Sequence, residues 1–286
     1  MINKQGLLNN TRIFLLLSTL TGLFIAAGFY LGGTLGMILG LVLAGVMNFG
    51  SYWFSHKIVL KMHKAEEMTK EDYPKYHEML EKLSENADIP KPKLYKNDMQ
   101  VPNAFATGRN PEHGVVCLTE GLMNELEMEE IEGVVAHELA HIKNRDTLIN
   151  AIVATLAGAL AIAARIVFWS ALFSGNRNRA QALSSLAFMI LVPLIAMLMK
   201  FAISRSMEYR ADSAAVKIHG QKEGLTSALK KISSRNDQSQ TKSSQVKEST
   251  SNMFIYNPFS GDKLTKYFST HPQLNQRIEN IQKTEI

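Results

Sequence analysis

The sequence contains very little cysteine, because Cys117 is the only one among 286 residues. A single cysteine cannot form an internal disulfide or supply a cysteine cluster for a metal, so a disulfide scaffold and a zinc finger are excluded. A strong excess of charge is also missing, since 31 Lys and Arg against 26 Asp and Glu leave a net charge of +5. So small a positive charge does not indicate nucleic-acid binding, and we expect no nucleic-acid partner.

Charged residues are missing altogether from position 13 to position 56. The run divides near residues 31–34, which include two glycines, into two apolar halves that each approach the roughly 20 residues needed to span a bilayer. A cleaved signal peptide is the alternative, but its apolar region is shorter and is not followed at once by a second one. We therefore predict a transmembrane helical hairpin over residues 1–56, with the lipid bilayer as its partner.

Lysine and arginine predict the orientation of this hairpin. Lys4 and Arg12 precede the first apolar half, the turn carries no charge, and Lys57, Lys61 and Lys64 follow the second half. Because cytoplasmic flanks are rich in lysine and arginine, we expect both ends of the hairpin to face the cytoplasm.

Two further uncharged windows cover residues 147–164 and 180–199. Their connecting loop carries Arg177 and Arg179, which runs against the positive-inside rule if that loop lies outside. Either both windows span the membrane, or they form a buried or half-inserted hairpin. We favour a second transmembrane hairpin over residues 147–203.

The rest of the chain has the composition of a soluble domain and divides into two parts, 57–146 and 204–286. Helical spacing of apolar residues, breaks at proline and glycine, and short apolar stretches predict a mainly α fold with a small β-sheet. Cys117 is expected to be a small strand residue. The predicted elements are a helix over 57–96, a sheet within 94–119, a helix over 120–146 softly broken at 123–128, a helix over 204–219, and a mobile Ser/Gln/Lys-rich loop over 233–251.

The most informative motif is the H-E-x-x-H sequence from His137 to His141 on a strongly helical stretch. A spacing of four residues places His137 and His141 on one helix face, so that both imidazoles can reach one metal ion. Glu138 is rotated by about 100° and can act as a general base without being a ligand. Two surface histidines are the alternative, but apolar residues flank the motif and indicate a mostly buried helix.

A catalytic zinc site needs a third protein ligand and an open fourth position. Glu208 is the best candidate, and Asp212 lies four residues later on the same helix face. One of the two could bind the metal while the other accepts the free N–H of a ligating histidine. The alternative is a salt-bridged surface helix, because Arg205 and Arg210 are adjacent, and spacing alone favours that alternative.

Five motifs occur along the chain in a fixed order. They are Pro102-Asn103-Ala104-Phe105-Ala106-Thr107-Gly108, the stretch from Val115 to Leu122, His137-Glu138-Leu139-Ala140-His141, Glu208-Tyr209-Arg210-Ala211-Asp212, and Thr270-His271-Pro272 with Arg277. The set resembles the HtpX-type membrane zinc metalloproteases, relatives of the CAAX prenyl endopeptidases. The resemblance runs from the hairpin to the end of the chain and implies an α+β zincin-like protease domain. It also implies one Zn²⁺ per chain with Glu208 as third ligand and Asp212 as the partner of a ligand.

The same resemblance implies roles for four further residues. Asn103 would lie beside the cleft and either contact substrate or shape the cleft. The strand around residues 115–118 would be an exposed edge for an extended peptide. The alternative is that Asn103 belongs only to a turn before a strand. His271 would stabilise the oxyanion of the reaction, or else lie near a helix start. Arg277 is expected to brace the site, and Asp146 to be structural.

The leading hypothesis is a zinc endopeptidase of the bacterial cytoplasmic membrane, with its site facing the cytoplasm. By resemblance, its polypeptide substrates are damaged or misfolded membrane proteins under stress. The alternative is a metal-stabilised membrane scaffold or adaptor without catalysis. Glu138 separates the two, because a structural zinc needs no base and normally has four protein ligands. A four-span transporter is disfavoured, since the polar chemistry lies outside the apolar windows. The sequence indicates no oligomeric state.

Overall fold

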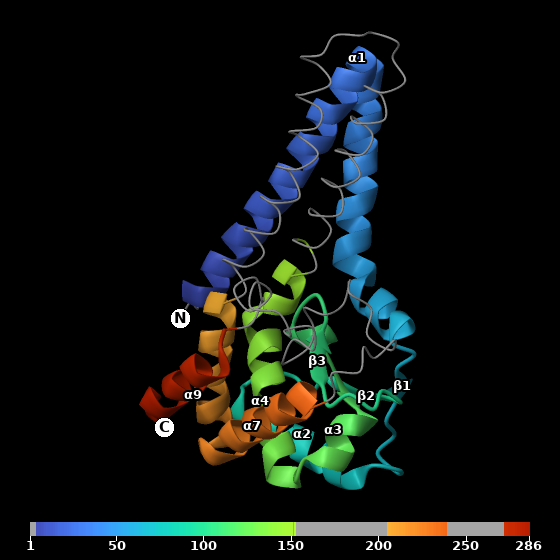
Figure 1. Ribbon diagram of the computed structural model, residues 1–286. Coiled ribbons are helices and arrows are strands. Elements are labelled where there is room, and N and C mark those ends of the chain that lie inside the picture. Colours follow the sequence, from blue (N-terminus) through green and yellow to red (C-terminus); the bar gives the residue numbers. More distant parts are fainter. Residues whose placement is uncertain (1–3, 151, 153–204, 239–271) are drawn as a thin grey trace. The chain divides into compact units, whose positions relative to one another are not determined.

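The computed structural model describes residues 4–150, 152, 205–238 and 272–286 and shows a mostly helical chain with one small sheet (Figure 1). Contacts divide the chain into two compact units. The first unit comprises residues 1–54 and 149–202, and the second comprises residues 55–148 and 203–286. Further helical residues lie at 146–150 and 205–219. The other elements are α1 (Lys4–Met62), β1 (Glu66–Glu67), α2 (Pro74–Asn86), β2 (Lys93–Asn97), β3 (Ala104–Thr107), η1 (Pro111–His113), β4 (Val115–Thr119), α3 (Glu120–Glu125), α4 (Met128–Asn144), α7 (Glu223–Gln238) and α9 (Leu274–Lys283).

The first unit contains the apolar part of α1, which is a helical hairpin. The backbone leaves the helical conformation at Gly32 and Gly33, and Gly33 has a φ of 59°, a region that favours glycine. This confirms the predicted turn near residues 31–34. The two arms, Thr11–Phe29 and Gly32–Phe54, are each long and apolar enough to cross a membrane.

Small residues let the two arms of α1 approach closely. A Cβ atom added to Gly28 would lie 2.1 Å from the carbonyl oxygen of Gly36. Nearer the base of the hairpin, Asn48 Nδ2 donates a hydrogen bond of 3.0 Å to Thr21 Oγ1 on the other arm. Glycine contacts and interhelical hydrogen bonds are what associate helices in lipid, where burial of apolar surface from water contributes nothing.

The sheet belongs to the second unit and has the strand order β1-β2-β4-β3. β2 and β4 are parallel, whereas β1 pairs with β2 and β3 with β4 in antiparallel register. The expectation that the strand around residues 115–118 is an exposed edge is wrong, because β4 lies between β2 and β3. Among the described strands, β3 is the edge strand next to β4.

Cys117 lies in the middle of β4, opposite Phe105 of β3, and is fully buried. Burial raises the pKa of its thiol to about 12. The thiol is therefore protonated near neutral pH. This confirms that Cys117 is a small strand residue and not a reactive thiol.

Tertiary contacts change one predicted helix and one predicted loop, and a second predicted helix is broken where expected. The helix expected over 57–96 is interrupted, because β1 pairs with β2 and Pro74 starts a new helix. The predicted break within 120–146 is confirmed between α3 and α4. The loop expected over 233–251 is wrong for residues 233–238, which continue α7 because buried Ile232 and Ser233 hold that end against the core. Residues 239–251, and the second hairpin beyond residue 152, lie outside the described residues.

The core of the second unit is built around α4, which packs against α7, α2 and β3. The start of α7 approaches α4 at Gly133, where an added Cβ would lie 2.4 Å from the backbone nitrogen of Leu225. At the same crossing, a Cβ on Gly224 would lie 2.5 Å from the carbonyl oxygen of Glu129. The two glycines therefore set the distance between α4 and α7.

We expect Gly133→Ala to destabilise the second unit by about 2 kcal/mol, because the added methyl group has no space and the helices must separate. Thermal unfolding in detergent measures the effect as a lower midpoint. Ser234→Ala, on the exposed side of α7, is the control and should leave the midpoint almost unchanged. An unchanged midpoint for Gly133→Ala would contradict the close crossing.

Candidate metal centre

α4 places two histidines on one buried face. A capping box fixes its start, where the Glu130 carboxylate accepts a 2.9 Å hydrogen bond from the backbone nitrogen of Glu127. The helix ends at Arg145, whose φ is 58°. His137 and His141 point to the same side, with ring centroids 4.7 Å apart and their Nε2 atoms 3.1 Å apart. The predicted i, i+4 geometry is confirmed.

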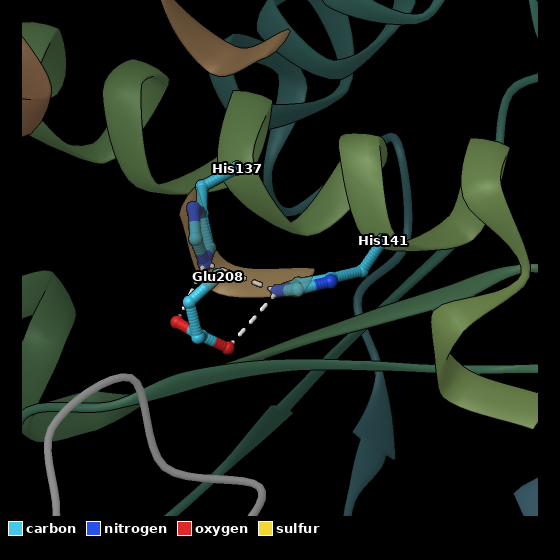
Figure 2. Close-up of side chains that lie close together, drawn as sticks. All are labelled: His137, His141 and Glu208. Atoms are coloured by element: carbon cyan, nitrogen blue, oxygen red, sulfur yellow. Dashed lines mark hydrogen bonds and ion pairs between the residues drawn. The ribbon is translucent and has the colours of Figure 1, made fainter. Parts of the chain in front are cut away.

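Glu208 reaches the same point from the helix over residues 205–219. Its carboxylate oxygens lie 3.6 Å from His137 Nε2 and 3.4 Å from His141 Nε2, and Figure 2 shows the carboxylate facing both rings. Glu208 is 5% exposed and Asp212 is fully buried. Neither carboxylate lies on a salt-bridged surface, so that alternative does not hold.

The three side chains fit a metal ion. Each histidine directs Nδ1 toward an aspartate, so an Nδ1–H tautomer leaves both Nε2 lone pairs pointing at each other and at Glu208. The three ligand atoms all lie within 4.8 Å of one another. With both Nε2 atoms unprotonated, this group of converging buried acceptors is unfavourable unless a cation satisfies it. Two imidazoles and a carboxylate are donors that divalent transition metals bind.

Asp212 fixes the ring of His137, and Arg277 fixes Asp212. His137 Nδ1 lies 3.0 Å from Asp212 Oδ1. Arg277, from α9, donates to both oxygens of Asp212 at 2.9 and 2.7 Å, and its Nη1 lies 3.5 Å from Glu208. Arg277 therefore contacts both Asp212 and Glu208 beside the two histidines, and it is itself 2% exposed.

Asp146 plays the corresponding part for His141, and its importance was missed in the sequence. Its Oδ2 lies 3.1 Å from His141 Nδ1, and its Oδ1 lies 3.4 Å from Nη2 of Arg210. Asp146 is fully buried. Each of the two imidazole rings thus lies beside an aspartate that is in turn paired with an arginine. The available signal was a carboxylate shortly after the second histidine, at the turn that ends α4.

The electrostatics of the cluster favour a cation. Burial lowers the pKa of His137, but hydrogen bonds to Asp212 and Glu208 outweigh it and raise the pKa above its ordinary value. His141 behaves likewise, with Asp146 and Glu208 raising its pKa well above the ordinary value against the effect of burial. Surrounding carboxylates therefore stabilise positive charge at this point.

Glu138 lies next to the ligands without joining them and is 5% exposed. Burial raises the pKa of its carboxyl group, while nearby His137 and His141 oppose this effect. The carboxylate accepts a hydrogen bond from the backbone of Ala106 in β3. A carboxylate with a raised pKa, fixed beside a metal site, is suited to accept and return a proton.

Asn103 is buried at the start of β3 and helps to shape this edge of the sheet. Its backbone nitrogen donates to Thr119 Oγ1 at 2.9 Å, and its carbonyl oxygen accepts from the backbone nitrogen of Thr119 at 3.0 Å. His271 lies outside the described residues.

Comparison with known proteins agrees with this geometry. Residues 70–285 match Peptidase family M48. The chain is 44% identical over 278 residues to the Protease HtpX homolog of Desulforapulum autotrophicum, covering 96% of this chain and 89% of that protein. It is 42% identical over 278 residues to Protease HtpX of Legionella pneumophila, covering 96% and 99%. The crystal structure of S. mikatae Ste24p has a similar fold, with a TM-score of 0.54 at 18% identity, and the likeness covers 92% of this chain and 62% of that one.

Together, these likenesses and the two apolar arms of α1 define a membrane-associated metalloprotease. The chain belongs to peptidase family M48, and the resemblance to the HtpX-type proteases is confirmed.

We expect Asp146→Asn to weaken metal binding about 10- to 100-fold, because an amide holds the His141 ring less firmly and lowers its basicity. Competition with a chromogenic chelator measures the dissociation constant directly. Asp98→Asn, an exposed carboxylate, is the matched control and should leave the constant unchanged. Equal affinity for Asp146→Asn and the parent would show that the aspartate does not support the ligand.

Proposed function

We propose that the chain is a zinc endopeptidase in which His137, His141 and Glu208 hold the metal. The convergence of these three ligand atoms within 4.8 Å, on two buried helices, carries the proposal. Two histidines and one carboxylate are a ligand set of the kind found in catalytic zinc sites, which keep one position for water or substrate. A zincin-like arrangement of the protease domain is consistent with this ligand set.

His137, His141 and Glu208 would hold a zinc ion, whose positive charge would polarise a water molecule and the scissile carbonyl. Glu138 accepts the proton of the attacking water and delivers it to the leaving amine. Asp212 and Asp146 hold the two imidazoles in the Nδ1–H tautomer, so that both Nε2 atoms stay available. Arg277 balances the negative charge of Asp212 and Glu208 and holds the helix over residues 205–219 in place against α4.

The edge strand β3 offers a place for the substrate. Ala106 pairs with Val116 on one side, and its backbone N–H reaches Glu138 beside the metal ligands. An extended polypeptide added alongside β3 would therefore pass close to Glu138. Main-chain pairing of this kind is insensitive to side-chain identity, which suits a protease that degrades many substrates. We assign Asn103 the role of shaping the start of this edge, and His271 that of stabilising the oxyanion.

Membrane proteins are the proposed substrates, in a quality-control role that removes damaged or misfolded chains under stress. The two apolar arms of α1 support this, because they keep the protease where such chains are found. The lysines that follow the hairpin support a cytoplasmic location of the site in a bacterial cell membrane, with the segment 147–203 as a second hairpin.

Glu138→Gln should lower casein cleavage and self-cleavage by about 10²- to 10⁴-fold while bound zinc stays near the parent level, because the amide cannot accept the proton. Glu129→Gln, an exposed position on the same helix, serves as control and should cleave normally. If Glu138→Gln cleaves as fast as the parent, the enzyme proposal fails and a metal-stabilised scaffold is favoured. Full zinc content in Glu208→Ala would contradict the third-ligand assignment.

The orientation of the chain in the membrane can be tested in a Cys117→Ala background, which removes the single native cysteine. Thr34→Cys in the hairpin turn and Asn176→Cys between the second pair of windows should react with a membrane-impermeant maleimide in intact cells. Lys82→Cys, exposed on α2, should react only after the membrane is opened. Labelling of Lys82→Cys in intact cells would reverse the proposed topology, and protection of Asn176→Cys would exclude the second spanning hairpin.

A further inference from the structure

Two threonine hydroxyl groups lie at opposite ends of β3, the edge strand to which we assign substrate binding. At its start, the backbone nitrogen of Asn103 donates a 2.9 Å hydrogen bond to Thr119 Oγ1. At its end, Thr147 Oγ1 donates a 3.0 Å hydrogen bond to the carbonyl oxygen of Gly108. Both threonines and the whole of β3 belong to the second unit. The strand is therefore tied at each end to a side chain from another part of that unit.

Thr119 is fully buried, and all the bonding positions of its hydroxyl group are used. Oγ1 accepts from the backbone nitrogens of Asn103 and Leu122 and donates to the carbonyl oxygen of Val101 at 2.9 Å. A hydroxyl group offers one donor and two acceptor positions. The backbone nitrogen of Thr119 also donates to the carbonyl oxygen of Asn103 at 3.0 Å. Thr119 thus joins the end of β4 and the start of α3 to the start of β3.

Thr147 lies in the segment after α4 and directly follows Asp146, which contacts His141. Consecutive helical residues point about 100° apart, so Asp146 faces His141 while Thr147 faces the end of β3. The β3–β4 connection also touches α4 itself, because a Cβ added to Gly114 would lie 3.0 Å from Cγ2 of Ile142. One two-residue segment therefore contacts a proposed metal ligand with its first side chain and the substrate edge with its second.

The ladder between β3 and β4 determines which backbone groups of β3 point to its outer edge. In an antiparallel pair, every second residue bonds to the neighbouring strand. Because Asn103 bonds to Thr119, the N–H and C=O groups of Ala104 and Ala106 are directed away from β4. The N–H of Ala106 accordingly donates to the Glu138 carboxylate. A shift of either end of β3 would move these groups relative to Glu138.

We propose that Thr119 and Thr147 are positioning residues that hold the two ends of β3 and so align an extended substrate with Glu138 and the proposed zinc ligands. This inference rests on the proposed protease function. Pairing along an edge strand uses several main-chain hydrogen bonds at fixed spacing, so a strand that frays at one end loses part of that pairing. Each threonine acts through the backbone of β3 and not by contact with the substrate.

Thr147→Val tests the proposal, because it removes the hydroxyl group of a partly exposed residue and keeps its shape. The background is Glu138→Gln, which prevents cleavage and whose amide oxygen can still accept from Ala106. Fluorescence anisotropy measures the binding of fluorescein-labelled casein to the zinc-loaded protein in detergent. We expect Thr147→Val to raise the dissociation constant for casein about fivefold, the effect of losing one hydrogen bond. Zinc affinity, measured by chelator competition, should stay unchanged.

Hydrogen–deuterium exchange gives a second readout that needs no substrate. Thr147→Val should increase the exchange rate of the amides between residues 103 and 114 about fivefold, because the end of β3 opens more often. Thr147→Ser keeps the hydroxyl group and should restore both this rate and casein binding. Thr119→Val should also weaken casein binding, together with a lower thermal midpoint, and Thr119→Ser should restore both.

Thr69→Val is the matched control. Thr69 lies just after β1, at the opposite edge of the sheet, and its hydroxyl group bonds to the side chain and the backbone of Asp72. Thr69→Val therefore also loses hydroxyl hydrogen bonds, but it should leave the dissociation constant for casein and the exchange of residues 103–114 unchanged. A change in casein binding that equals that of Thr147→Val would show a general effect of stability and overturn the proposal.

A dissociation constant for Thr147→Val equal to that of its background would overturn the proposal. An equal loss of zinc and casein affinity would do so as well, because Thr147 would then act through Asp146 on His141. If the protein with intact Glu138 fails to cleave casein while Thr147→Val still weakens its binding, the protease proposal fails and the positioning role is supported. Absence of casein binding in the background protein would refute the substrate edge and this inference together.

Discussion

The buried ion cluster between α4, the helix over residues 205–219 and α9 is the constraint on which the protease unit depends. Asp212, Arg277 and Glu208 are all removed from water, and each would be costly to bury without its partners. Arg277 of α9 pairs with both carboxylates. Displacing α9 would therefore leave Asp212 and Glu208 buried without their positive partner. Segments that lie far apart in the sequence are thereby held to one geometry.

The same cluster explains why the ligand rings are held so firmly. Each imidazole contacts an aspartate, and each aspartate is paired with an arginine. Arg277 pairs with the aspartate beside His137, and Arg210 pairs with the aspartate beside His141. In the proposed zinc site, the two Nε2 atoms would therefore already be directed at the metal.

Local patterns predicted much of this protein, although not all of it. The spacing of His137 and His141 follows from helix geometry, and the turn at Gly32 and Gly33 follows from glycine within an uncharged run. Glu208 could be identified only through the family resemblance, because spacing alone favoured a salt-bridged surface helix. The role of Asp146 was missed, since nothing local shows that the chain after Arg145 turns back toward His141.

The sequence by itself determined the features that depend on near neighbours: the apolar arms, the histidine face of α4, and the short strands. The tertiary structure alone decided which strand is the edge, that α7 continues through residues 233–238, and which carboxylate faces which imidazole. Those outcomes depend on contacts between residues many positions apart, such as β2 with β4 or Asp212 with Arg277. Packing and the pairing of buried charge select among arrangements that are equivalent in local propensity.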